Sequence, residues 1–272
     1  MSTLAQVSPP NCTTDTARPV PFWLWPNLLC LDAPIVALVW QDFLARCFSV
    51  PLLPQGRLTL MLTVWAIYLG DRLLDVRTLA QGAETGPHRF CREHRRAVTA
   101  LLIAVLIANL TVCLVWVRRP VLWNGMAVFA GVAVYFEAFP VRRLSGIWKP
   151  LAAAGLFTLG VFLIAWTRLG EAGRMLAWPA IAFGVLCLAN LLLIQAWERR
   201  EWHRARALGG VMAVLAAVCL LAQMSLWYLA VALAAAGLAT LAFLGNRLGR
   251  DARRVMADAV LLSPLLLWTL PQ

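Results

Sequence analysis

Residues 97–117 read AVTALLIAVLIANLTVCLVWV, an apolar run that contains no charged side chain. Arg95 and Arg96 precede the run, and Arg118 and Arg119 follow it. About 20 predominantly apolar residues in a helix are enough to cross the hydrocarbon core of a bilayer. The run also lacks the strict alternation of apolar and polar residues that is typical of a strand. It therefore predicts a transmembrane helix.

The rest of the chain has the composition of a protein built from such helices. Of its 272 residues, 61% are hydrophobic and 14% are charged, and the mean hydropathy is +0.75. A water-soluble domain cannot bury that much apolar surface, whereas helices in lipid satisfy their own backbone hydrogen bonds. We expect an all-α, polytopic membrane protein with about nine transmembrane helices, at residues 22–44, 58–74, 97–117, 121–139, 151–166, 175–196, 208–221, 226–244 and 255–270.

The basic residues predict the orientation of these helices. The formal net charge is +11, but the arginines stand in short tracts between apolar runs, so we expect no nucleic-acid partner. With nine spans, 18 of the 24 Lys and Arg residues fall on one side of the membrane. Basic loops remain in the cytoplasm, which places the N-terminus there. We expect a multi-pass protein of a bacterial inner membrane, with a disordered cytoplasmic tail at residues 1–20 and a single transmembrane domain at residues 21–272.

Two aspartates at the predicted cytoplasmic end of the second span form the sharpest local pattern. The sequence YLGDRLLDVR at residues 68–77 places Asp71 and Asp75 four residues apart. This spacing puts both carboxylates on one helical face, where they could bind Mg²⁺ together with substrate phosphates. The alternative is that Asp71 and Arg72 are solvated charges at a helix end.

Basic residues surround this pattern and follow the fourth span on the same side of the membrane. Arginine and lysine side chains there could neutralise the charge of a diphosphate that the metal leaves uncompensated. The candidates for diphosphate binding are Arg72, Arg77, Arg89, Arg142, Arg143 and Lys149.

Other polar residues lie within or just after apolar runs. Asp32 stands in the first span, where an ionisable side chain suggests a function. Its alternative role is to cap a helix that Pro26 and Pro34 interrupt. After the sixth span, candidates for a second metal site are Asn190, Glu198 and Glu201, with Gln195 as a further polar residue of a cavity. Alternatively, the two glutamates are solvated charges on a continuing helix.

Together these motifs resemble the UbiA superfamily of intramembrane prenyltransferases. The likeness rests on LDAPI at residues 31–35, DRLLD at 71–75, FPVRR at 139–143 and NLLLIQAWERRE at 190–201. It implies nine helices around a lipid-open cavity, with acidic cytoplasmic loops after the second and sixth helices that hold Mg²⁺ and an isoprenoid diphosphate. By this resemblance, Asp71 and Asp75 are the catalytic metal ligands.

The function that the resemblance implies is a magnesium-dependent transferase in contact with membrane lipids. It would move a prenyl group from an isoprenoid diphosphate to a lipophilic acceptor, either an aromatic compound or a quinone precursor. Two alternatives remain open: a terpene cyclase of the same superfamily, which would use the same diphosphate site, and a non-catalytic lipid-binding or transport protein. Transporters tend to place polar residues near the bilayer midplane, whereas these carboxylates gather at one membrane face.

Overall fold

The computed structural model describes residues 21–78, 86–138, 146–221 and 225–270, and over these residues it is helical without any strand. This confirms the all-α prediction. The predicted tail at residues 1–20 and two of the predicted phosphate ligands, Arg142 and Arg143, lie outside the described residues.

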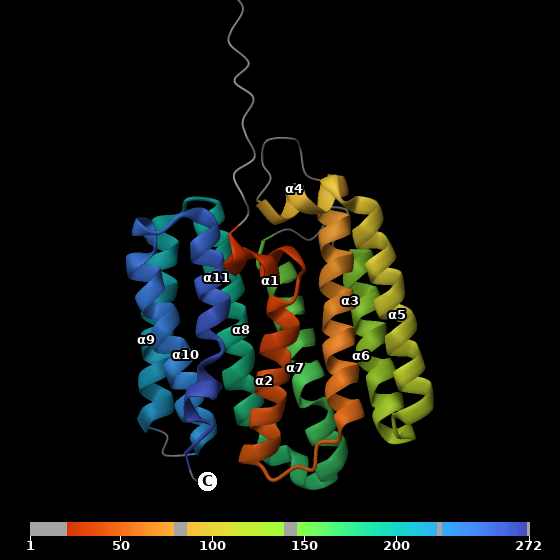
Figure 1. The fold of residues 1–272 in the computed structure, drawn as a ribbon. Helices are drawn as coiled ribbons and strands as arrows, with labels where there is room; N and C mark the ends of the chain where they lie inside the picture. The colour runs from red at the N-terminus through yellow and green to blue at the C-terminus, as the bar shows by residue number, and fades with distance from the viewer. Residues whose placement is uncertain (1–20, 79–85, 139–145, 222–224, 271–272) are drawn as a thin grey trace, which may run out of the picture.

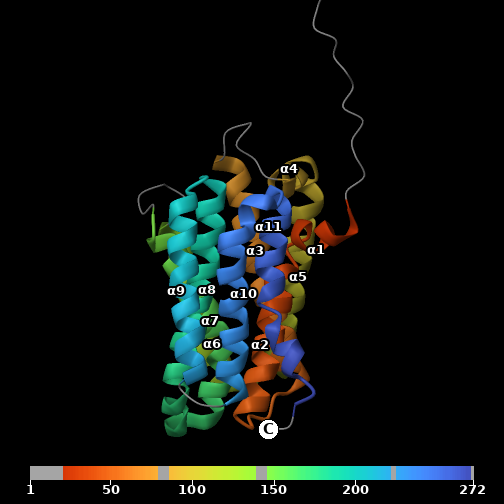
Figure 2. The same ribbon diagram turned by 90° about the vertical axis from the view of Figure 1, so that its left-hand side faces the viewer.

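The helices stand side by side as an upright bundle (Figures 1 and 2). They are α1 (Trp25–Leu28), α2 (Asp32–Cys47), α3 (Pro54–Thr78), α4 (Gly86–Glu93), α5 (Arg95–Trp116), α6 (Arg119–Ala138), α7 (Trp148–Leu169), α8 (Ala177–Glu198), α9 (Trp202–Leu221), α10 (Leu226–Leu244) and α11 (Arg250–Val260). Short 3₁₀ helices complete the path: η1 (Phe22–Leu24), η2 (Gly170–Leu176), η3 (Gly245–Arg247) and η4 (Ser263–Leu267).

Five helical segments among the described residues are long and apolar enough to cross a membrane, and six if the bent pair α1–α2 is one span. One of the five is Trp148–Glu198, which contains both α7 and α8. These helices pack against each other, since a Cβ on Gly184 of α8 would lie 3.2 Å from Oγ1 of Thr158 on α7. The structure therefore supports a multi-pass membrane protein with several apolar helices.

Two of the predicted spans are interrupted in the structure. The first run, 22–44, bends by 83° between Leu28 and Asp32, where Cys30 has a positive φ of 56°. The last run, 255–270, leaves α11 after Val260 and continues as η4. The break in the first run agrees with the interruption that the prolines suggested, since Pro34 lies in the first turn of α2, and Pro264 lies at the start of η4.

The outer faces of α5, α6 and α9 are apolar and exposed. In the most apolar stretch of α5, only 11% of the residues are buried inside the bundle. The buried share is also 11% in the most apolar stretch of α6. Their exposed side chains include Ile107, Leu114, Trp123, Phe129 and Val214. Such a surface would be unfavourable in water and is typical of helices that face lipid.

Two apolar cores hold the bundle together. The larger joins α2, α8 and α10 around aromatic rings, with centroids 5.1 Å apart for Trp40 and Trp227 and 4.7 Å apart for Trp40 and Phe183. The smaller core includes Leu69 of α3 and Val105 of α5. The short helix α4 lies across one end of the bundle (Figure 1), next to the C-terminal end of α3.

Candidate functional site

Asp71 and Asp75, in the last two turns of α3, contact the same cation. The ammonium of Lys149, at the start of α7, lies 3.2 Å from Oδ1 of Asp71 and 3.3 Å from Oδ1 of Asp75. The two carboxylates therefore share one helical face, as their spacing predicted. Their side chains are 34% and 35% exposed, so a ligand can reach them from outside the bundle.

Two further side chains contact this pair from α6 and α4. The hydroxyl of Tyr135 donates a hydrogen bond of 3.4 Å to Oδ1 of Asp71, and Nε2 of His88 lies 3.8 Å from Oδ2 of Asp75. Both Tyr135 and His88 are buried. Four helices thus position the carboxylates, and α4 closes one side of the site.

The two carboxylates of Asp71 and Asp75 are the kind of ligand that magnesium prefers. A single cation already contacts both carboxylates, and Mg²⁺ prefers one or two carboxylates together with water and substrate phosphates. Among the described residues, no group of three or more His, Cys, Asp and Glu side chains could hold a metal ion by itself. A magnesium ion at this pair would complete its coordination with water and with oxygens of a bound substrate.

Arg72 is not a solvated helix-end charge. It is only 9% exposed, and its guanidinium lies within electrostatic range of Cys30 and Asp32. One of its terminal nitrogens is buried without a hydrogen-bond partner among the described residues. Arg72 therefore links the aspartate pair to a second polar cluster deeper in the protein.

That second cluster is built around Asp32 and Asp258. Asn27 donates a hydrogen bond of 2.7 Å to Asp32, and Asn190 donates one of 3.2 Å to Asp258. The two carboxyl groups lie within electrostatic range of each other. Tyr68 of α3 lies within electrostatic range of Asp32, Asp258 and Asp71. Asp32 is the first residue of α2, whose N-cap is Leu31, and no side chain caps this helix.

Sequence reasoning missed Asp258, Tyr135 and Tyr68. Asp258 stands in the run that was assigned to the ninth span, and an ionisable residue in an apolar run is a signal for function. That argument singled out Asp32 and could equally have found Asp258. The two tyrosines carry no such signal, because a tyrosine in an apolar helix is common at the membrane interface.

The three candidates for a second metal site contact different side chains. Glu198 forms an ion pair of 3.4 Å with Arg254, and Glu201 forms one of 3.1 Å with Arg204. Asn190 faces Asp258 instead of either glutamate. The structure gives these three candidates separate partners.

The remaining candidates lie near the same end of the bundle. Arg77 is exposed at the end of α3, and Arg89 is exposed on α4, one residue after His88. Gln195 is half-buried near the end of α8. Arg77 and Arg89 can thus approach a ligand that binds the aspartate pair from outside.

Comparison with protein-family models, curated proteins and solved structures finds no match to this chain. The resemblance to the UbiA superfamily thus rests on the motifs alone. A function has to be argued from the site's own geometry.

Proposed function

We propose that this protein is a magnesium-dependent intramembrane prenyltransferase of the UbiA kind. Its substrates would be an isoprenoid diphosphate and a lipophilic aromatic or quinone-precursor acceptor. The observation that carries the proposal is the contact of one ammonium group with both Asp71 and Asp75 at the end of a bundle of apolar helices. Such a pair suits a diphosphate head, while the apolar surroundings suit an isoprenoid tail.

The proposed membrane topology has nine crossings. They are α1–α2, α3, α5, α6, α7, α8, α9, α10 and the segment of α11 and η4 from residue 255 onward. This count exceeds the apolar segments for three reasons: α7 and α8 form one continuous segment, α3 carries several charges, and α11 has only 11 residues. We place the end that bears α4 in the cytoplasm, since most of the basic residues follow or precede helix ends there.

The residues of the site have distinct roles in this proposal. Asp71 and Asp75 hold the metal, and Tyr135 and His88 fix the two carboxylates by their contacts. Lys149 neutralises the pair before substrate binds and turns to the phosphate oxygens afterwards. Arg77 and Arg89 add positive charge at the outer edge. When bound, Mg²⁺ would stabilise the negative charge that develops on the departing diphosphate.

A terpene cyclase of the same superfamily would use the same site but would capture the allylic cation with the substrate's own double bond. A non-catalytic binding or transport protein would hold the diphosphate without cleaving it. A transferase makes a prenylated acceptor, a cyclase makes a cyclic hydrocarbon, and a non-catalytic protein makes no product. One assay that identifies the product therefore distinguishes the three functions.

That assay is incubation of the purified protein with Mg²⁺ and geranyl, farnesyl or geranylgeranyl diphosphate, with and without aromatic acceptors. We expect pyrophosphate release that depends on Mg²⁺ and on the acceptor, together with a prenylated product. Release of pyrophosphate with a cyclic hydrocarbon and no acceptor would instead establish a cyclase. Binding without release would contradict catalysis and leave only the diphosphate site.

A further inference from the structure

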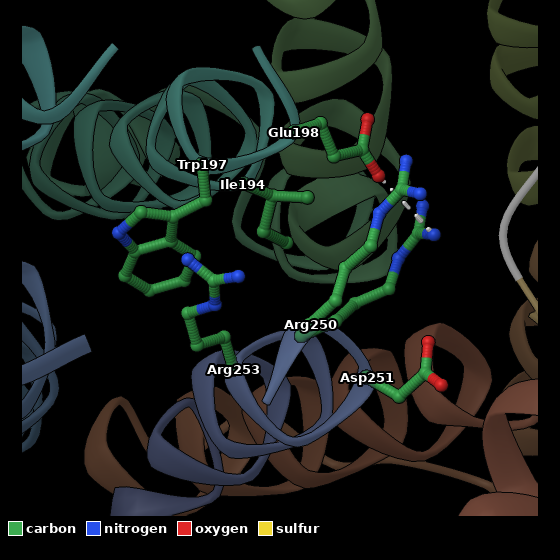
Figure 3. Close-up of a pocket in the computed structure, with 7 residues that line it drawn as sticks. Ile194, Trp197, Glu198, Arg250, Asp251 and Arg253 are labelled. Atoms are coloured by element: carbon green, nitrogen blue, oxygen red, sulfur yellow. Dashed lines mark ion pairs between the residues drawn. The ribbon is translucent and has the colours of Figure 1, made fainter. Parts of the chain in front are cut away.

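A pocket between α8 and α11 lies apart from the aspartate pair (Figure 3). Its lining residues are Ile194, Trp197, Glu198, Arg250, Asp251, Arg253 and Arg254. The free volume is about 10 Å³, which is enough for one water-sized group. A single oxygen of a ligand can therefore enter the pocket while the rest of that ligand stays outside.

The positive charge of this pocket exceeds its negative charge. Glu198 is engaged by Arg254 at 3.4 Å, an ion pair that Figure 3 shows as a dashed line. Asp251 points away from Arg253 in the same view, and its carboxylate lies beside Gly86 at the start of α4. Among the described residues, neither Arg250 nor Arg253 forms an ion pair with an acidic side chain, so both positive charges are available to an anion.

Arg253 carries the clearest unmet hydrogen-bonding capacity. Its Nε and one terminal nitrogen are buried and have no hydrogen-bond partner among the described residues, while its guanidinium lies 5.0 Å from the ring centroid of Trp202. Burial and the nearby charges of Arg250 and Arg200 lower the pKa of the Arg253 guanidinium. Buried donors without an acceptor are costly, and a bound phosphate oxygen would satisfy them.

Apolar surface adjoins the pocket. The end of α10 packs on Trp197, since a Cβ on Gly245 would lie 3.3 Å from the Trp197 ring. The two residues before it, Phe243 and Leu244, are about half exposed. A ligand with both a phosphate and an acyl chain would contact both surfaces, whereas free phosphate would contact only the arginines.

We propose that Arg250 and Arg253 bind the phosphate of an anionic membrane phospholipid, whose acyl chain lies along Phe243 and Leu244. The guanidinium fork of Arg253 can donate to a phosphate oxygen in the pocket. Exposed Arg250 contributes charge from outside the pocket. This site is independent of the proposed prenyl transfer, because it uses α8, α10 and α11 and none of the residues around Asp71.

The test is an equilibrium titration of the purified protein, in neutral detergent, with acyl-chain-labelled phosphatidylglycerol. Phosphatidylcholine with the same chains, inorganic phosphate and pyrophosphate form the comparison arms. We expect Arg253→Gln to weaken phosphatidylglycerol binding about tenfold, as the loss of charge-assisted hydrogen bonds implies. Arg206→Gln, which removes an exposed charge near the start of α9, is the matched control and should change binding little.

Two further variants keep the test decisive if Arg253→Gln does not fold. Arg250→Gln alters an exposed residue and should weaken phosphatidylglycerol binding without changing magnesium-dependent pyrophosphate release. Arg253→Lys keeps the charge but loses the fork, so we expect an intermediate affinity. Equal affinity of all variants for phosphatidylglycerol would overturn the site. Arginine-dependent binding of inorganic phosphate or pyrophosphate, with none of phosphatidylglycerol, would overturn the lipid as its ligand.

Discussion

Lys149 occupies the position from which one cation reaches both Asp71 and Asp75. The i, i+4 spacing of the aspartates was enough to predict that they share a face. It could not predict Lys149, which is 74 residues from Asp75 along the chain. Spacing determines neighbours within a helix, whereas contacts between helices depend on packing.

At the residue scale, Lys149 should compete with magnesium. Without diphosphate, Lys149→Gln should bind Mg²⁺ about fivefold more tightly, because a partly exposed ion pair of about 1 kcal/mol no longer has to be broken. With diphosphate present, the same change should weaken substrate binding, because an ammonium ligand of phosphate is lost. Calorimetric titration of Mg²⁺ measures the first effect. Weaker magnesium binding by this variant in the absence of substrate would contradict the competition.

The burial of Arg72 gives a prediction about stability. Arg72→Leu leaves Asp32 without a buried positive neighbour, and removing one partner of a buried charged cluster costs roughly 3 kcal/mol. Arg77→Gln, at an exposed position on the same helix, should cost little. Thermal unfolding in detergent compares the two. Similar midpoints for both variants would mean that Arg72 is not part of a charged cluster.

At the scale of elements, apolar runs predicted helix positions well where no residue interrupts them. The run 226–244 coincides with α10 (Leu226–Leu244). The run 58–74 is shorter than α3 (Pro54–Thr78), because charged residues at its ends are helical but not apolar. Hydropathy alone gave no position for the bend in the first run, since no hydropathy pattern signals the positive φ of Cys30.

Close packing of α10 against α11 supplies a test of that element pair. A Cβ on Gly237 would lie 2.5 Å from Cγ1 of Val260, so Gly237→Ala requires the Val260 side chain or the helices that carry the two residues to shift. We expect a loss of about 1–3 kcal/mol in stability, as for other overpacked interiors. Gly155→Ala is the control, because no atom lies within 4 Å of the added methyl group. A stability of Gly237→Ala equal to that of this control would contradict the close packing.

At the scale of the whole molecule, α1 lies at the end of the bundle that bears α4, whereas η4, the last short helix, lies toward the opposite end (Figure 1). An odd number of crossings requires this arrangement. Reporter fusions before residue 21 and after residue 270 should therefore report opposite sides of the membrane, with the N-terminal reporter in the cytoplasm. Both reporters on one side would contradict the nine-crossing topology.

The most direct test of the central claim is the magnesium-dependent binding of farnesyl diphosphate to Asp71→Asn, Asp75→Asn and the double variant. The control is Asp42→Asn, whose carboxylate pairs with Arg57 away from the site. If one metal ion bridges both carboxylates, each single variant should lose about a hundredfold in affinity, and the double variant should be scarcely weaker, because residues that act as a unit are not additive. Modest losses that add in free energy, or binding that does not depend on magnesium, would contradict a shared metal site.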